Sequence, residues 1–403
     1  MKYIVMLCDG MAGKPLAELN GMTTLEAAKT PVFDRLAKTA EVGLASMVPE
    51  GMAPGSDTAN LAVMGYDPKV YYTGRSPLEA LSIGVDMLDT DVSFRCNIVT
   101  LSEEDCAYED RTIIDHSSDE ISTEDAKILV DALKEGLKKE GYEFYVGTSY
   151  RHLLIQKNGE MVDLVPPHDV LTQRVGQYLP SDKVLRDMME KSFDILNHHP
   201  LNEERRAKGL HPANSAWFWG AGKKPMLTSF EEQTGKKGMM ISAVDLLKGI
   251  AVGASMDKVI IEGANGGLHT NYEGKALAAI KAIMEDGYDF VYIHVEAPDE
   301  MGHQGSMTDK IKAIENIDEK VMKLVVEELE AKNIEFRLLV LPDHPTPIEV
   351  RTHTGDPVPY LLYDSTKQME GQEFYNEKTA SQTGIYWKDG YQLMGHLLEE
   401  EIC

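Results

Sequence analysis

Cysteine is scarce in this sequence, and its few cysteines form no recognisable pattern. They are Cys8, Cys96, Cys106 and Cys403, and no two of them stand in a CxxC pair. This spacing indicates neither a disulfide framework nor a thiolate metal site. The chain begins MKYIVMLCDG, without a basic and apolar leader. We therefore expect a reduced, cytoplasmic protein.

Long apolar runs and positive charge are also in short supply. No apolar run approaches the roughly 20 residues that a membrane-spanning helix needs. Lysine and arginine number 40 against 66 aspartates and glutamates, which gives a formal net charge of −26. Nucleic acid or an anionic membrane surface would be repelled over most of such a protein, and we expect neither as a partner. A small anionic substrate stays open, because bound divalent cations can reverse the field inside one site.

The composition and the pattern of elements are those of a globular α/β protein. Its 403 residues, 43% of them hydrophobic, can bury a large core and predict two to three domains or one core with an insertion. The first strand candidate, KYIVML, ends just before Asp9, and residues 30–40 predict a helix with Thr30 as its N-cap. Further helices are predicted at residues 310–332 and 391–402. The alternation of strands and helices predicts a mainly parallel sheet.

One part of the chain departs from this alternation. Residues 86–180 contain short strand candidates around one long helix, which is typical of a separate α+β domain. We therefore predict a core formed by residues 1–85 and 181–403, interrupted by a smaller cap domain at residues 86–180. The segment SAWFWG, residues 215–220, is predicted to be a strand of the core.

Polar side chains follow strand candidates at four places in the predicted core. They are Asp9, Ser56, Asp299 with His303, and Asp343 with His344, followed by His353. The spacing of Asp299 and His303 places both on one face of a helical turn. Carboxylate oxygens and imidazole nitrogens together suit Zn²⁺ or Mn²⁺. Two such ions would clamp a phosphoryl group and stabilise both the entering and the leaving oxygen.

The stretch EGMAPGSDTANLAVMGYDP raises the question of what Ser56 does. A serine before a short helix is typical of an ordinary N-cap. The free amides at that helix end also favour a phosphate, and a metal bound to the serine oxygen would favour a nucleophilic alkoxide. Each of the other clusters likewise has a structural interpretation, as a solvated helix face or a turn between prolines. Their joint occurrence after four strands favours a catalytic centre.

Six segments together resemble one known family. They are LCDGMAGKP, PGSDTANLAVMGYDP, YYTGRSPLEA, FRCN, HVEAPDEMGHQG, and LPDHPTP followed by THTGDPVP. Over nearly its whole length the chain is similar to the archaeal-type, cofactor-independent phosphoglycerate mutases of the alkaline phosphatase superfamily. The resemblance implies an alkaline-phosphatase-like, three-layer α/β core with a mainly parallel sheet and an inserted, smaller α+β cap domain.

The same resemblance implies the cofactors, their ligands and the reaction. Two divalent ions are expected, Mn or Zn with Mg or Co as alternatives, and no 2,3-bisphosphoglycerate. One ion would be held by Asp9, Ser56, Asp343 and His344, and the other by Asp299, His303 and His353. Ser56 would take the phosphoryl group from 3-phosphoglycerate and return it to the other hydroxyl of the reoriented glycerate.

The cap domain is implied to hold the glycerate. Candidate residues in the cap are Arg95, Asn97, Arg111, Arg151, His152, His168 and Asp169. Lys223 and Lys224 are expected to reach the phosphate from the core side. The competing interpretation for each cation is that it only solvates a surface. The substrate is expected to be a small anionic or zwitterionic metabolite, and the sequence gives no oligomeric state.

One segment departs from the family pattern. Where an arginine-rich segment is expected, residues 114–122 read IDHSSDEIS, with Asp119 and Glu120 in place of cations. A carboxylate pair would repel phosphoglycerate and suit an ammonium group, such as that of homoserine. Since some bacterial relatives are proposed homoserine kinases, the second hypothesis is a homoserine kinase on the same core. Two further alternatives are a phosphomonoesterase or phosphonate hydrolase, and a metal-binding module without catalysis.

Overall fold

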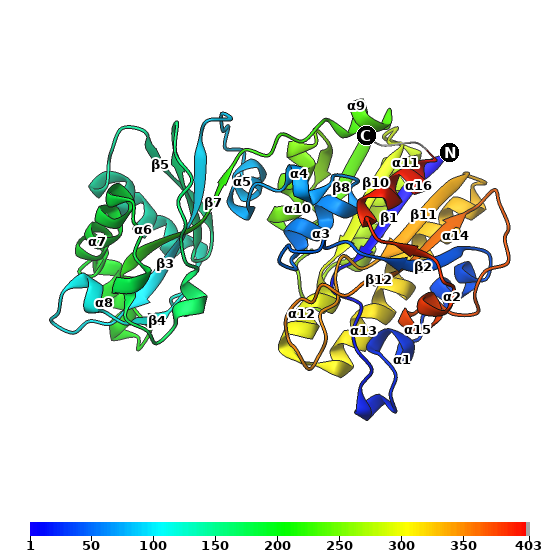
Figure 1. Ribbon diagram of the computed structural model, residues 1–403, viewed down its shortest axis with the longest axis horizontal. Coiled ribbons are helices and arrows are strands. Elements are labelled where there is room, and N and C mark those ends of the chain that lie inside the picture. Colours follow the sequence, from blue (N-terminus) through cyan, green and yellow to red (C-terminus); the bar gives the residue numbers. More distant parts are fainter. Residues whose placement is uncertain (400–403) are drawn as a thin grey trace. The chain divides into compact units, whose positions relative to one another are not determined.

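The computed structural model describes residues 1–399, and the chain forms two compact units (Figure 1). Unit 1 comprises Met1–Tyr72 and Leu227–Cys403, and unit 2 comprises Thr73–Met226. Each unit has its own sheet and its own buried core. Among the described residues, no helix combines the length and the apolar character needed to cross a membrane.

Unit 1 is built around an eight-stranded sheet. In chain order its strands are β1 (Lys2–Cys8), β2 (Glu41–Ala45), β8 (Gly238–Ile241), β9 (Asp257–Val259), β10 (Phe290–Val295), β11 (Phe336–Leu341), β12 (Val358–Asp364) and β13 (Tyr386–Trp387). Across the sheet the order is β13-β2-β12-β11-β1-β10-β8-β9. Only β12 runs antiparallel to its neighbours, β11 and β2, among the described pairs. The prediction of a mainly parallel sheet is therefore confirmed.

Helices cover both faces of this sheet. They are α1 (Thr24–Ala27), α2 (Pro31–Ala37), α3 (Ser56–Val63), α4 (Pro68–Tyr71), α9 (Phe230–Thr234), α10 (Asp245–Gly253), α11 (Tyr272–Met284), α12 (Ala297–Gln304), α13 (Met307–Ile317), α14 (Lys323–Ala331), α15 (Glu377–Gln382) and α16 (Leu393–Leu398). Ile4, Met6 and Cys8 of β1 share a hydrophobic cluster with side chains of α2, α11, α13 and α14. Val5 and Leu7, equally buried, point to the opposite face because strand residues alternate.

Unit 2 contains an antiparallel sheet packed against helices. Its strands are β3 (Val92–Leu101), β4 (Ile113–Asp115), β5 (Tyr142–Thr148), β6 (Arg151–Gln156) and β7 (Ser215–Lys223). Its helices are α5 (Arg75–Ser82), α6 (Thr123–Gly136), α7 (Lys183–Leu196) and α8 (Pro200–Ala207). β3 pairs with β4, β6 and β7, and β6 pairs with β5. Leu129 of α6 and Met189 of α7 are buried in one cluster with Phe94 and Trp217 of the sheet.

The boundaries of unit 2 differ from the predicted cap at residues 86–180. α5 begins before that range, and α7, α8 and β7 follow it, yet all four belong to unit 2. The segment SAWFWG is not a core strand, because β7 pairs along β3 from Val92↔Lys223 to Val99↔Ser215. The change in the pattern of strand and helix candidates at residues 86–180 marks only the middle of the insertion. Its sheet is completed by pairing between segments that are distant in sequence.

Two predicted helices are interrupted or shorter. The predicted helix at residues 310–332 consists of α13 and α14, joined by a π-helical segment at Asp318–Met322. The predicted closing helix at residues 391–402 is described as α16, Leu393–Leu398. Residues 400–402 of that prediction lie outside the described part of the chain.

The helix predicted near residue 30 begins where expected, but its cap is different. Thr30 occupies the N-cap position of α2 and makes no side-chain hydrogen bond there. Instead, the Asp318 carboxylate accepts hydrogen bonds from the Phe33 N–H at 2.8 Å and the Val32 N–H at 3.1 Å. A residue of the π-helical segment therefore satisfies first-turn amides that a local cap would otherwise bind.

Candidate active site

Three neighbouring strands lead the predicted core residues to one edge of the unit 1 sheet. β1 lies between β10 and β11 and is parallel to both, with Cys8 opposite Val295 and Leu7 opposite Leu341. Because these strands run the same way, their carboxyl ends meet, where open α/β sheets place their ligands. Asp9 follows β1 directly, α12 follows β10, and the loop after β11 supplies the remaining candidates.

Asp9, Asp343 and His344 form the first group of possible metal ligands. One side-chain atom of each lies within 4.8 Å of the others, and all three residues are buried. His344 Nε2 lies 3.6 Å from Asp9 Oδ1 and 3.3 Å from Asp343 Oδ2. Ser56 Oγ lies 3.1 Å from the same nitrogen. The structure thus brings together the four residues that were predicted to share one ion.

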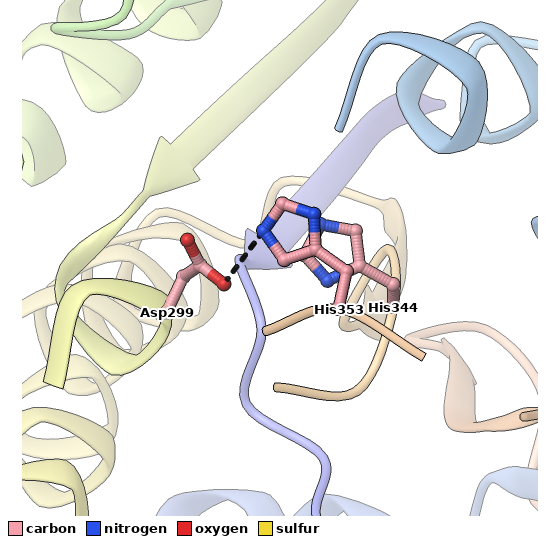
Figure 2. A group of neighbouring side chains, drawn as sticks. All are labelled: Asp299, His344 and His353. Atoms are coloured by element: carbon pink, nitrogen blue, oxygen red, sulfur yellow. Dashed lines mark ion pairs between the residues drawn. The ribbon is translucent and has the colours of Figure 1, made fainter. Parts of the chain in front are cut away.

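Asp299, His303 and His353 form the second group. Asp299 and His303 lie one turn apart on α12, with His303 Nε2 3.2 Å from Asp299 Oδ2. Figure 2 shows the ion pair between the Asp299 carboxylate and His353, whose Nε2 lies 3.5 Å from Oδ1. The ring of His344 stacks on that of His353, with centroids 3.9 Å apart. His344 is therefore shared between the two groups, which form one continuous cluster.

The surroundings of Asp9 fit a bound cation. Asp9 Oδ2 lies 2.9 Å from His294 Nε2, and Ser242 Oγ lies 3.0 Å from the other nitrogen of that imidazole. Asp9 Oδ1 is buried and has no hydrogen-bond partner within the described part of the chain. A buried carboxylate oxygen without a donor is costly unless a cation or a water meets it. With the oxygen and nitrogen ligands around it, this oxygen fits divalent ions of the expected kind.

The two groups of possible metal ligands differ in the direction in which the pKa of an aspartate, Asp9 or Asp299, is shifted. Burial raises the pKa of Asp9, and the carboxylates of Asp343 and Asp299 raise it further. Burial acts in the same direction on Asp299, but hydrogen bonds from His303 and His353 outweigh it and lower the pKa of that carboxyl. The Asp299 carboxylate in turn raises the pKa of His303 to about 9. Carboxylates crowd one another around Asp9, and a dication would offset this repulsion.

Ser56 begins α3 but does not cap it. Gly55 is the N-cap residue, and Ser56 is the first residue of the helix. The Ser56 hydroxyl instead faces His344, as given above. The Thr58 N–H of the first turn donates to Asp57 Oδ1 at 2.9 Å, and the remaining N–H groups at a helix N-terminus can receive a phosphate. The interpretation of Ser56 as an ordinary cap is therefore wrong, because the side chain points to the ligand cluster.

Three of the predicted substrate residues converge on Trp219 of β7. The guanidinium carbon of Arg95 lies 4.1 Å from the centroid of the Trp219 ring. Trp219 Nε1 donates a hydrogen bond to Asn97 Oδ1 at 3.0 Å. The ring of His168 lies with its centroid 5.3 Å from that of Trp219. Cross-strand pairing of Arg95 with Trp219 explains this arrangement, since β3 and β7 are neighbours.

Arg151 joins the same region through two residues that the sequence did not single out. The guanidinium carbon of Arg151 lies 5.4 Å from the centroid of Tyr150. The ring of His116 lies 5.7 Å from Tyr150 and 6.0 Å from His168, measured between centroids. We call these side chains the Trp219 cluster, which consists of Arg95, Asn97, His116, Tyr150, Arg151, His168 and Trp219. No signal in the sequence pointed to His116, Tyr150 or Trp219, and Trp219 enters the cluster through the pairing of β7 with β3.

Arg111, which was also predicted to bind the substrate, makes contacts within unit 2 that do not involve the Trp219 cluster. Arg111 Nη1 donates to the carbonyls of Ser102 at 2.8 Å and Glu104 at 2.9 Å. Its guanidinium carbon lies 3.9 Å from the centroid of Phe193. Arg111 therefore fixes a loop of unit 2 to α7.

The carboxylates of IDHSSDEIS do not form a free anionic pair. Asp119 accepts a hydrogen bond from the His211 N–H at 2.7 Å, and its other oxygen lies 2.8 Å from His211 Nδ1. Glu120 is exposed and has a left-handed backbone, with φ of 49°. The Asp119 carboxylate thus has partners within unit 2. The presence of Asp119 and Glu120 where cations were expected therefore does not by itself create a site for an ammonium group.

The other predicted substrate residues divide between buried and exposed positions. His152 is buried, and its Nδ1 accepts a hydrogen bond from the Gly147 N–H at 3.1 Å. Asp169 is exposed beside His168, with Oδ1 3.7 Å from His168 Nε2. Lys223 and Lys224 end the β7 region within unit 2, which corrects their assignment to the core side.

Comparison with known proteins identifies relatives over the whole chain. A sequence profile for 2,3-bisphosphoglycerate-independent phosphoglycerate mutase matches residues 37–202. The 2,3-bisphosphoglycerate-independent phosphoglycerate mutase of Methanosarcina acetivorans is 45% identical over 405 residues, which cover 99% of this chain and 100% of the relative. The structure of a Pyrococcus horikoshii protein matches with a TM-score of 0.82 and 29% identity, covering 100% of this chain and 98% of that one. The cofactor-independent phosphoglycerate mutase of Thermoplasma acidophilum matches with a TM-score of 0.65 and 26% identity, covering 99% of both chains.

Proposed function

The chain belongs to the family of 2,3-bisphosphoglycerate-independent phosphoglycerate mutases, and from this premise we propose that it interconverts 3-phosphoglycerate and 2-phosphoglycerate through a phosphorylated Ser56. One observation carries the proposal. The Ser56 hydroxyl lies at the start of α3, 3.1 Å from His344 Nε2 and therefore among the seven predicted core residues. A hydroxyl at the first residue of a helix, where N–H groups can receive a phosphate, favours a nucleophile over a residue that only binds metal.

The proposed reaction consists of two phosphoryl transfers. Ser56 Oγ attacks the phosphorus of 3-phosphoglycerate, the bond from phosphorus to the 3-oxygen breaks, and the serine proton ends on that oxygen. Glycerate and phosphoserine result. After the glycerate turns, its 2-hydroxyl attacks the phosphoserine, and Ser56 recovers a proton as 2-phosphoglycerate forms. The first-turn amides of α3 stabilise the phosphoryl oxygens in both steps.

Two divalent ions are proposed as cofactors, Mn²⁺ or Zn²⁺ with Mg²⁺ or Co²⁺ as alternatives. Asp9, Ser56, Asp343 and His344 would hold one ion, and Asp299, His303 and His353 the other. When bound, the ions supply positive charge that stabilises the attacking and leaving oxygens. The chain itself supplies the carboxylates and imidazoles, held at the distances given above.

Unit 2 is proposed to hold the glycerate, with the Trp219 cluster as its binding surface. Burial lowers the pKa of Arg95, and the nearby guanidinium groups of Arg75 and Arg151 lower it further. The Glu79 carboxylate acts in the opposite direction and raises it. Such a concentration of guanidinium groups suits a carboxylate, which arginine binds through paired hydrogen bonds. Among the described residues, no observation favours homoserine over glycerate, since Asp119 is bound by His211.

Two parallel assays test the proposal on the metal-loaded protein. One follows 3-phosphoglycerate to 2-phosphoglycerate by ³¹P nuclear magnetic resonance, and the other follows ATP-dependent phosphorylation of homoserine. Mutase turnover of about 1 s⁻¹ or more is expected, without homoserine phosphorylation. Homoserine phosphorylation without mutase turnover would overturn the proposal in favour of the kinase.

Substitution of the nucleophile completes the test. Ser56→Ala is expected to lower kcat by at least about 10³-fold, because no phosphoserine can form. Ser381→Ala is the matched control, since that hydroxyl lies on α15 and donates only to the nearby Lys378 carbonyl. Full turnover by Ser56→Ala with its metal content intact would exclude the phosphoserine route.

A further inference from the structure

We propose that Asn60 is a positioning residue, which holds the Asp343 carboxylate and the start of α3 in one arrangement through an amide whose orientation is set by Tyr292. The inference rests on the proposed metal and serine site, and it adds a residue that is not itself a predicted ligand. Asn60 lies on α3, Tyr292 on β10, and Asp343 follows β11. Three elements of unit 1 therefore meet at one carboxamide.

Every hydrogen-bonding group of the Asn60 carboxamide has a partner. Its Nδ2 donates to the Ser56 carbonyl at 2.8 Å and to Asp343 Oδ2 at 2.9 Å. Its Oδ1 accepts from the Tyr292 hydroxyl at 2.6 Å. The three side chains are almost fully buried, with Asn60 1% exposed and Asp343 and Tyr292 within the core. Water is therefore not at hand to replace a lost partner.

The orientation of the amide follows from the chemistry of its partners. The Ser56 carbonyl and the Asp343 carboxylate can only accept hydrogen bonds, so both require the NH₂ end of Asn60. A flipped amide would place Oδ1 against these two acceptors. Tyr292 provides the donor that Oδ1 needs, and thereby holds the NH₂ group toward the site.

Asn60 determines how the Asp343 carboxylate is turned. Asp343 Oδ1 accepts hydrogen bonds from the Gly10 N–H at 3.2 Å and the His344 N–H at 2.9 Å. Asp343 Oδ2 is held by Asn60 on one side and lies 3.3 Å from His344 Nε2 on the other. Loss of the Asn60 donor would free the carboxylate to rotate away from the nitrogen with which it is predicted to share an ion. Partners of this kind are known to tune metal affinity.

The same amide couples this carboxylate to the nucleophile. Asn60 stands four residues after Ser56 on α3, so that its side chain lies on the same helix face. By binding the Ser56 carbonyl it links the first turn of the helix to Asp343. A displacement of Asn60 would therefore disturb a predicted ligand and the position of the serine hydroxyl together, whereas a residue that only packs the core would disturb neither specifically.

The test removes one hydroxyl. Tyr292→Phe deletes the donor to Asn60 Oδ1 and leaves every predicted ligand unchanged. Tyr66→Phe is the matched control, because Tyr66 is equally buried in unit 1 and its hydroxyl donates at 2.7 Å to the Thr228 carbonyl, which is not a predicted ligand. Metal-free protein is titrated with Mn²⁺ by calorimetry. For Tyr292→Phe we expect about 10- to 100-fold weaker binding of one of the two ions, and for Tyr66→Phe unchanged binding of both.

A second variant and a second measurement separate positioning from a general loss of packing. Asn60→Ala removes the amide and is expected to weaken the same ion at least as much as Tyr292→Phe. In both variants kcat should fall while KM for 3-phosphoglycerate stays within about twofold, because the proposed glycerate contacts in unit 2 are unchanged. The absorption bands of bound Co²⁺, recorded for the wild type and both variants, should change at one site only.

The outcomes are distinct from those that test the proposed function. Wild-type Mn²⁺ affinity in both Tyr292→Phe and Asn60→Ala would overturn the role of Asn60, even if mutase activity were established. An equal loss of affinity in Tyr66→Phe would also overturn it, because the effect would then reflect the stability of unit 1. Binding of two ions without mutase turnover would instead reject the proposed reaction and leave the ion titration to decide on Asn60.

Discussion

At the scale of single residues, neighbours on one strand have opposite environments. Arg151 and His152 follow each other on β6, and only Arg151 is exposed, beside Tyr150, because strand side chains alternate. We expect Arg151→Gln to raise KM for 3-phosphoglycerate about tenfold in steady-state kinetics, since one charged hydrogen bond to the substrate is lost. Arg174→Gln is the control, because this exposed arginine pairs with Asp110. Equal effects of the two substitutions would contradict a role for Arg151.

His152 gives a pH-dependent prediction. Burial lowers the pKa of His152 to about 3, whereas an unfolded histidine titrates near about 6.5. Between these values the unfolded chain binds more protons, so the unfolding free energy falls as the pH decreases, by at most about 1.4 kcal/mol per pH unit. His152→Asn keeps an acceptor for the Gly147 N–H and removes this titration. Urea unfolding of metal-free protein at about pH 5 and about pH 7 should show a weaker pH dependence for His152→Asn than for wild type.

The exposed His198 supplies the comparison for this measurement. His198→Asn is expected to keep the wild-type pH dependence, because it removes an exposed side chain and leaves the buried His152 unchanged. If His152→Asn retained the full wild-type slope, acid destabilisation would have to come from other groups.

The residues of the candidate site were predictable to different degrees. Asp9 and Asp343 could be singled out because each follows an apolar strand candidate, and neighbouring parallel strands bring such positions together. Asn60 and Tyr292 could not, because an asparagine inside a helix and a tyrosine inside a strand are ordinary core residues in sequence. Their importance depends on hydrogen bonds between elements, which no spacing along the chain encodes.

At the scale of elements, local signals located helices and strands, and long-range contacts decided their ends and partners. Thr30 before Pro31 is a sound N-cap signal, yet the amides at the start of α2 are bound by Asp318. The π-helical segment at Asp318–Met322 was equally invisible, because the apolar periodicity of α13 continues into α14. A helix interior that carries the cap of another helix cannot be recognised from either segment alone.

Asp318 therefore has an effect on stability that its sequence position does not suggest. Asp318→Ala is expected to lower the unfolding free energy by about 1–3 kcal/mol, because two N–H groups of α2 lose their acceptor. Burial raises the pKa of Asp318 to about 6, so the folded chain binds more protons than the unfolded chain from about pH 4 to about pH 6, and the contribution of Asp318 declines as the pH rises. Urea unfolding should thus show a larger loss near about pH 5 than near about pH 8.

The neighbouring carboxylate provides the control for Asp318. Glu319 is exposed on the same segment, and Glu319→Ala should change the unfolding free energy by less than about 0.5 kcal/mol. A loss of equal size in the two variants would show that the segment responds to any lost charge and not to the loss of the α2 cap.

At the scale of the whole molecule, the sequence indicated two domains but misplaced their boundaries. The chain leaves unit 1 after Tyr72 and returns at Leu227. Residues 86–180 stand out in sequence because several strand candidates surround one long helix there, whereas α7 followed by β7 has the same local pattern as a helix and strand of the core. Only the pairing of β7 with β3 assigns that segment to unit 2. Domain membership is thus a property of tertiary pairing.

The division into two units predicts which part of the protein loses stability when metal is removed. All seven predicted ligands lie in unit 1, so ions bound there stabilise the fold of that unit, by about 2.7 kcal/mol per site at a free ion concentration of about 100 times Kd. Chelation of the full-length protein should therefore speed amide hydrogen exchange in β1, β10 and β11 by up to about a hundredfold per site, and leave β3, β6 and β7 unchanged. Asp9→Asn should show a smaller response to chelator, because one ion is already bound weakly. Equal acceleration in both units would mean that they unfold as one cooperative body, and no acceleration would mean that the ligand cluster binds no stabilising ion.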